Sequence, residues 1–325
     1  MIRRQDFEKL NDELQETYME SSENAITEMV GPKFFEAKET SLYDYLHQVL
    51  HGVSGIKRIA DGENFPRVKG KQGDNVTWTQ RHYGADVPIT KDMRKFDRYD
   101  EANELVETIV DEAWNDIDQS LADVLLKGWS TSYTDVWGDA VSAVGPDGLA
   151  LFSTAHTNNV TSRTFSNVIS DGTNNNPTLS REAIVYQIKQ GRINKDVHGK
   201  NRSIKYDLLI VPPSLEDLAY RIVESDKLQG SQDNDTNNWL RKRVKIIVWD
   251  RLESAADGTD TSAYWFMADS RKIMKVLKML FSERPTLDAP DILYTNKEWD
   301  WTIDFYYTLG FGYPIGLVGS NGSAT

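Results

Sequence analysis

The chain has 325 residues, a formal net charge of −13 and no cysteine. The lack of cysteine excludes disulfides, thiolate catalysis, cysteine zinc sites and iron–sulfur clusters. No apolar segment reaches the roughly 18 residues that cross a bilayer, and the charged N-terminal segment is unlike a signal peptide. The sequence therefore predicts a soluble protein without an export signal, and its charge opposes general binding to nucleic acid or anionic lipid.

Residues 1–60 are predicted to form an N-terminal arm. Phe7, Leu10 and Leu14 repeat at helical spacing, and a second helix is expected over residues 41–52, where apolar residues again recur every three or four positions. The arm has too few apolar residues to bury a core of its own, so we expect it to lie on another surface.

Residues 61–100 are predicted to form an extended β-hairpin, with strands at 75–83 and 87–96. Such a ribbon is marginally stable alone, because it carries few large apolar side chains. The segment is rich in basic residues, and those expected to contact another subunit are Arg67, Lys69, Lys71, Arg81, Lys91, Arg94 and Lys95.

The strongest helical pattern runs from Glu101 to Lys127, where apolar residues recur at i, i+3, i+4 and i+7 for about seven turns. Its outer face is acidic, and Glu104, Asp111 and Asp118 are the expected contacts for the basic hairpin of a neighbouring copy. The alternative is that the basic and acidic segments are two independently solvated surfaces.

The rest of the chain predicts a mixed body that ends in a long antiparallel ribbon. We expect one unit over residues 101–204, a second over 205–270, and closing strands over 271–325. Within them, Ser180 and Ser214 are expected to cap helices. The predicted strands are 206–211, 244–249, 263–268, 272–281 and 298–309.

Three patterns resemble catalytic or ligand sites but lack essential parts. His47 and His51 have the spacing of two zinc ligands on a helix, yet the glutamate base and a third ligand are missing. The glycines of 310–316 do not have dinucleotide-loop spacing. Asp300 and Asp304 could imitate a glycosidase pair, but acidic pairs arise by chance in so acidic a chain.

The stretch GLALFSTAHT places Ser153 near His156 after a short apolar strand. Ser153 lacks the paired glycines of a nucleophile elbow, so we do not expect catalysis at this stretch. The nine tryptophans would suit a sugar-binding enzyme, although Trp114 and Trp249 are better explained as core residues. We expect no catalytic residue, cofactor or metal ion.

Three stretches in order carry a family resemblance: GLALFSTAH followed by Asn167, LLIVPPSLEDLAYRIVES, and the passage from YWFMADS through FSERPTLDAPD to GFGYPIG. Together they resemble the major capsid proteins of tailed bacteriophages. The resemblance implies the α+β Hong Kong 97-like capsid fold, with an N-terminal arm, an extended loop, a spine helix, a peripheral domain and an axial domain. It also implies that GLALFSTAHT is a strand and turn of the peripheral domain in which His156 bonds locally.

In that family the protein is a structural subunit of hexamers and pentamers that close an icosahedral head around double-stranded DNA. The resemblance implies contacts with copies of itself and with portal and scaffolding proteins, possible decoration proteins, no membrane, and assembly in the host bacterial cytoplasm. Two alternatives stay open: an encapsulin-type compartment shell, and a Trp-rich carbohydrate-active enzyme.

Overall fold

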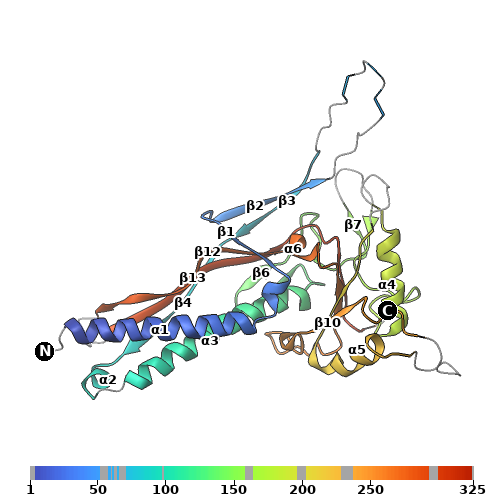
Figure 1. The fold of residues 1–325 in the computed structure, drawn as a ribbon. Coiled ribbons are helices and arrows are strands. Elements are labelled where there is room, and N and C mark those ends of the chain that lie inside the picture. Colours follow the sequence, from blue (N-terminus) through green and yellow to red (C-terminus); the bar gives the residue numbers. More distant parts are fainter. Residues whose placement is uncertain are drawn as a thin grey trace.

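Two four-stranded sheets and a long helix form the framework of the molecule (Figure 1). This computed structural model describes residues 4–51, 58–59, 61, 64–65, 71–96, 99–157, 164–195, 203–227, 237–292 and 299–323. The helices are α1 (Arg4–Glu28), α2 (Lys91–Lys95), α3 (Tyr99–Leu126), α4 (Arg181–Ile193), α5 (Glu216–Val223) and α6 (Ile273–Val276). The strands are β1 (Glu36–Glu39), β2 (Asp44–His51), β3 (Lys71–Thr79), β4 (Arg81–Ile89), β5 (Ser132–Thr134), β6 (Ala140–Ser142), β7 (His156–Thr157), β8 (Thr164–Phe165), β9 (Leu208–Val211), β10 (Lys245–Val248), β11 (Trp265–Ala268), β12 (Leu277–Ile292), β13 (Trp299–Phe311) and β14 (Leu317–Ser320).

The first sheet has the strand order β1-β12-β13-β4 and is dominated by the antiparallel pair β12 and β13. Burial alternates strictly along the first half of β13, so that Trp301, Ile303 and Phe305 face the core and the residues between them face outward. This period of two is the pattern of a strand with one covered face.

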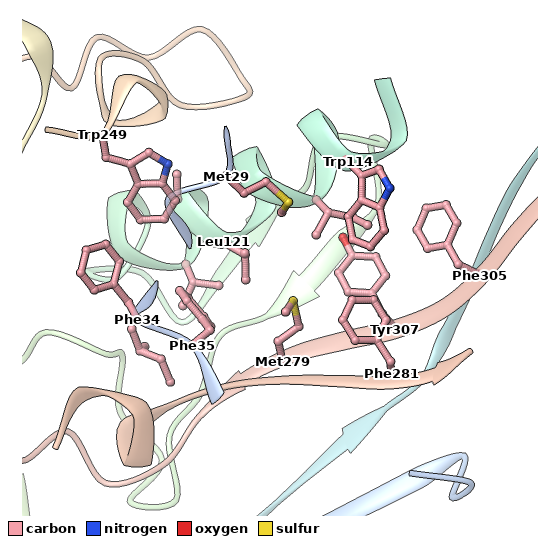
Figure 2. Packing of buried hydrophobic residues seen from close by; sticks show 14 of the residues in the cluster. Met29, Phe34, Phe35, Trp114, Leu121, Trp249, Met279, Phe281, Phe305 and Tyr307 are labelled. Atoms are coloured by element: carbon pink, nitrogen blue, oxygen red, sulfur yellow. The ribbon is translucent and has the colours of Figure 1, made fainter. Parts of the chain in front are cut away.

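Helix α3 covers the inner face of this sheet and confirms the helix predicted over 101–127. Its apolar stripe includes Ile117, Leu121 and Leu125, all with no exposed area. Figure 2 shows Leu121 and Trp114 packed between the aromatic residues of the sheet and the segment that follows α1. At about 25 cal/mol per Å² of apolar area, this burial is the main stabilising contribution to the body.

Helix α1 runs beside α3 in the same direction (Figure 1). Glu13 accepts a 3.1 Å hydrogen bond from Asn103, and nine residues further along Ser22 accepts one from Trp114 at 3.3 Å. Gln15 donates to the carbonyl of Leu287 at 2.8 Å, which satisfies an outward-facing group of β12. The predicted arm therefore lies on its own subunit along α1.

The second sheet has the order β10-β9-β11-β14 and packs against α4 and α5. Ser180 caps α4 as expected, because its hydroxyl accepts from the amide of Ala183. Ser214 does not cap α5. A 3-10 turn at Pro213–Leu215 precedes that helix, and the Ser214 amide and hydroxyl both bond to Glu253.

The predicted hairpin of residues 61–100 is wrong in its pairing. Strands β3 and β4 do not pair with each other: β3 pairs with β2, and β4 pairs with β13. The reason is long-range burial, since Val87 and Ile89 on β4 have no exposed area once they lie beside β13.

Two further expectations fail locally. The helix predicted over 41–52 is strand β2, where burial alternates from Asp44 to Val49 because β3 supplies a pairing partner that helical spacing could not reveal. The strand predicted over 272–281 begins with the short helix α6, and the strand then continues to Ile292.

Candidate intersubunit surfaces

Strands β2 and β3 form a two-stranded ribbon that leaves the body on the side opposite to α1 and α3 (Figure 1). At its base, Leu42, Tyr43 and Leu46 are 56%, 67% and 54% exposed. Neighbouring exposed apolar side chains of this kind are typical of surfaces that bind another protein. The ribbon therefore offers a contact surface and contributes little to the core.

Trp78 attaches the ribbon to the first sheet. Its ring lies so close over Gly310 that a Cβ atom there would be 2.1 Å from the ring, so only glycine fits. Tyr45 and His47 stack on Trp78 with ring centroids 6.0 Å and 4.9 Å away. Burial, reinforced by the positive charges of Lys278 and Lys38, lowers the pKa of His47, which keeps this stacked ring uncharged at neutral pH.

A single residue, Gln80, separates β3 from β4. The backbone amide of Gln80 donates to the carbonyl of Tyr43 at 2.8 Å, which ties together the two chain segments that enter the ribbon. Its side chain is 3% exposed, and both polar atoms lack hydrogen-bond partners among the described residues. An unsatisfied buried amide costs about 1 to 3 kcal/mol, so the junction is a strained point of the fold.

The predicted basic contact residues do not share one surface. Arg81 lies on β4, 3.3 Å from Asp135, and donates to the carbonyl of Ala140 at 2.7 Å, so it is held within its own subunit. Lys91, Arg94 and Lys95 belong to α2, at the other end of β4. Arg67 and Lys69 lie outside the described residues, and Lys71 is the first residue of β3.

Two of the three predicted acidic contacts reach the surface of α3. Glu104 is exposed and Asp111 is half-buried, but Asp118 is 5% exposed. Its carboxylate accepts from the amide of Gly31 and from the indole of Trp249, both at 2.9 Å. Burial raises its pKa, although these bonds oppose the shift. Asp118 therefore joins three parts of one subunit.

The burial of Asp118 could have been predicted from the sequence. It stands four residues after Trp114 and three before Leu121, within the apolar stripe of the helix. The helical spacing in the arm agrees with α1, but its position beside α3 was not predicted. There α1 extends the acidic face of α3, since no residue in 10–32 or 99–126 is lysine or arginine. The exposed acids of the pair are Asp12, Glu13, Glu16, Glu20, Glu23, Glu28, Asp100, Glu101, Glu104, Glu107 and Glu112.

His156 is fully buried and bonds locally, as the family resemblance implied. The strand expected before it is not formed, since residues 148–155 are bends and irregular backbone and only His156–Thr157 belong to a strand, β7. The Nδ1 of His156 lies 2.6 Å from Asp147, and its Nε2 lies 3.1 Å from Asn167 Oδ1 and 3.2 Å from the carbonyl of Leu151. The Asn167 amide is oriented by the Ser153 amide, which donates to Oδ1 at 2.9 Å.

Both nitrogens of His156 face hydrogen-bond acceptors, and Nδ1 pairs with the Asp147 carboxylate. Burial acts to raise the pKa of Asp147, but the hydrogen bond and charge of His156 lower it overall. Since Ser153 offers only its amide to this network, the arrangement lacks the nucleophile–base contact of a hydrolase.

The other candidate sites also have structural roles. His47 and His51 lie on strand β2, where the helical zinc spacing does not apply. Asp300 and Asp304 are four residues apart on β13, or about 13 Å at 3.3 Å per residue, which exceeds the separation in glycosidases. Trp301 is fully buried.

The described residues contain no group of three His, Asp or Glu side chains placed to bind a metal ion. Within the same residues, no helix combines the length and apolar character that a membrane crossing requires.

Comparisons with known proteins identify a family and a fold. Residues 75–320 match the phage capsid protein family. Solved structures with similar folds include the mature capsid of bacteriophage PhiM1 (14% identity, 89% of this chain and 86% of that chain, TM-score 0.50). They also include Gordonia phage Cozz (11%, 90% and 85%, 0.50) and the capsid of an empty GTA particle (10%, 89% and 87%, 0.50). No curated protein sequence matches significantly.

The two sheets, the long helix and the projecting ribbon thus define an α+β capsid fold. The family match covers α3, β4, both long strands and the whole second sheet. The chain belongs to the phage capsid protein family and is a structural major capsid protein.

Proposed function

We propose that copies of this chain assemble into hexamers and pentamers that close an icosahedral shell around double-stranded DNA. The observation that carries the proposal is the ribbon β2–β3, which leaves the body and contacts the first sheet through Trp78 at Gly310 and His47 at Gly312. A two-stranded ribbon is marginal alone, so a neighbouring subunit is its natural support. Membership of the phage capsid protein family indicates that the assembly is a protein shell.

Under this proposal the first sheet with α3 forms the peripheral domain and the second sheet forms the axial domain, with boundaries near residues 101, 205 and 271. Helix α4 precedes residue 205 but packs against the second sheet, so we assign it to the axial domain. The shell is part of the virion and assembles in the host bacterial cytoplasm. Portal and scaffolding proteins are its expected partners, with decoration proteins as possible additions. The proposal includes no catalysis, cofactor or membrane contact.

Two basic segments contribute separately to assembly in this proposal. Lys71 is the first residue of β3, and Arg67 and Lys69 precede it in the sequence outside the described residues. Helix α2 instead lies beside α3, away from the ribbon (Figure 1). In this proposal Lys91, Arg94 and Lys95 contact the acidic face around Glu104 and Asp111 of a neighbouring subunit. Each exposed ion pair contributes about 0.2 to 1 kcal/mol, and repetition around a shell adds these contributions.

Electron microscopy of the purified chain tests the assembly. We expect hollow closed particles, and we expect those from infected cells to protect DNA from nuclease. Particles that enclose an enzyme instead of DNA would support an encapsulin-type compartment. A monomer that hydrolyses glycans would support the carbohydrate-active enzyme and contradict the proposal.

Charge reversal tests the two basic segments. One variant changes Lys91, Arg94 and Lys95 to Glu, and the matched variant changes Arg67, Lys69 and Lys71 to Glu. We expect both to fold and to assemble poorly, and wild-type assembly to depend on salt. Normal assembly of either variant at wild-type salt dependence would remove that segment from the proposed contacts.

A further inference from the structure

A basic and aromatic platform lies where the chain enters β10, the edge strand of the second sheet. Between residues 239 and 245 the side chains that point outward are Trp239, Arg241, Lys242, Arg243 and Lys245. Leu240 and Val244 are 0% and 2% exposed and fix the segment from below. The chain has a net charge of −13, so four basic side chains within five residues form a local patch of opposite sign.

The platform is rigid because Asn238 ties it to the end of α5. The Asn238 side chain is 6% exposed and donates to the carbonyls of Ile222 at 2.7 Å and Val223 at 3.3 Å. Its oxygen accepts from the amide of Leu240 at 3.2 Å. These bonds occupy carbonyls that the end of a helix leaves free, so the basic residues are presented from a fixed base.

Two features of the outward side chains are typical of a binding surface. The Arg243 guanidinium lies 5.1 Å from the centre of the Trp239 ring, which is itself 38% exposed, so a cation–π contact holds the planar donor group in place. Lys242 has a φ of 64°, a left-handed conformation that glycine or asparagine adopts more readily. Backbone strain at an exposed lysine is a cost that concentrates at functional sites.

We infer that Lys242, Arg243 and Lys245 bind the phosphodiester backbone of nucleic acid. Arginine forks and lysine ammonium groups both suit phosphate oxygens, and the exposed Trp239 ring offers a face to a sugar or base. Arg241 contributes less, because it forms an ion pair with Asp226.

The position of the platform agrees with this assignment. Figure 1 shows α5 and β10 on the same side of the molecule as α1 and α3, away from the ribbon. The acidic face of α1 and α3 repels phosphate, so the platform is a local point at which DNA contact is favourable. The inference rests on the proposed function for the presence of DNA beside the subunit.

The test measures binding of a labelled 30-base-pair duplex to the full-length chain, at concentrations where light scattering detects no shells. We expect the variant with Lys242, Arg243 and Lys245 changed to Ala to bind about tenfold more weakly at low salt. Its slope of log affinity against log salt should fall by about 2 to 3, since each lost phosphate contact removes about 0.9. Single-stranded DNA should show the same loss, whereas polyglutamate should bind weakly to both proteins.

The matched control changes Lys189, Arg192 and Lys195 to Ala, which removes the same charge from exposed positions on and just after α4. This control should keep wild-type binding. Equal losses in both variants, or wild-type binding by the platform variant, would overturn the inference.

Lys242→Gly separates strain from binding. Glycine relieves the left-handed conformation, so the variant should melt at a higher temperature yet bind DNA with a salt slope reduced by about 1. Electron microscopy of the platform variant keeps the two proposals distinct. Normal shells with weakened DNA binding support the inference, whereas lost assembly with unchanged DNA binding would assign the platform to a second subunit and overturn it.

Discussion

The body of the subunit and its ribbon are stabilised in different ways. In the body, α1 and α3 cover one face of the first sheet, and residues such as Ile117 and Trp301 lose all exposure. In the ribbon, Trp78 is 7% exposed while Leu46 remains 54% exposed. The body folds by burying its own surface, whereas the ribbon is held to the first sheet by a few contacts, chiefly those of Trp78 and His47, and keeps apolar side chains exposed.

The largest expected effect is in the body, from Ile117→Asp. The side chain is fully buried in α3, so an unpaired charge there should cost about 3 to 5 kcal/mol and prevent folding. Circular dichroism and solubility measure the outcome. Ile109→Asp on the same helix is the control, because Ile109 is half-buried and should be less damaging. A folded Ile117→Asp subunit would contradict the role of the stripe.

The next effect is at the junction, from Trp78→Ala. Removing the ring that covers Gly310 should cost about 3 kcal/mol locally and release the ribbon without unfolding the body. Hydrogen exchange should become faster in β2 and β3 and stay unchanged in α3. If exchange in α3 rose equally, the ribbon would be part of the body's cooperative unit.

The third prediction concerns the pH dependence of the body's stability, which a buried carboxyl group should cause. Burial raises the pKa of Asp123 from 3.8 to about 6. Because the pKa is higher in the folded chain, stability should fall as pH rises between these values. Asp123→Asn should remove that dependence, adding about 2 to 3 kcal/mol near pH 8 and almost nothing near pH 3. Urea unfolding at the two pH values measures this, and parallel pH curves would refute it.

The smallest expected effect is on the ribbon surface, from Leu46→Ser. The residue is largely exposed in the subunit, so unfolding of the isolated chain should change by less than about 0.5 kcal/mol. Assembly should nevertheless slow, because a contact surface is lost. Light scattering follows assembly, and an unchanged rate would show that Leu46 stays exposed in the shell.

Local patterns in the sequence were sufficient for elements that form by burial along one helix. The α3 stripe and the Ser180 cap are examples, and the local network of His156 agrees with the prediction. Local patterns were insufficient where the pairing of a strand depends on segments that are distant in the sequence. Strands β3 and β4 are adjacent in sequence but pair with β2 and β13, and no local signal reveals those partners.

The candidate contacts were predicted less well than the fold. Arg81 looked like an exposed cation, but its partners Asp135 and Ala140 come from a turn more than fifty residues away. Asp118 looked like an outer acid, although its place in the apolar stripe indicated burial. Charge counts alone did not distinguish internal ion pairs from surfaces free to bind another molecule.

The most direct test of the central claim compares hydrogen exchange of the ribbon in isolated subunits and in closed shells. We predict that amides of β2 and β3 exchange at least about tenfold more slowly in the shell, while amides of α3 exchange at similar rates in both states. Equal ribbon exchange in the two states would contradict the claim that a neighbouring subunit completes the ribbon.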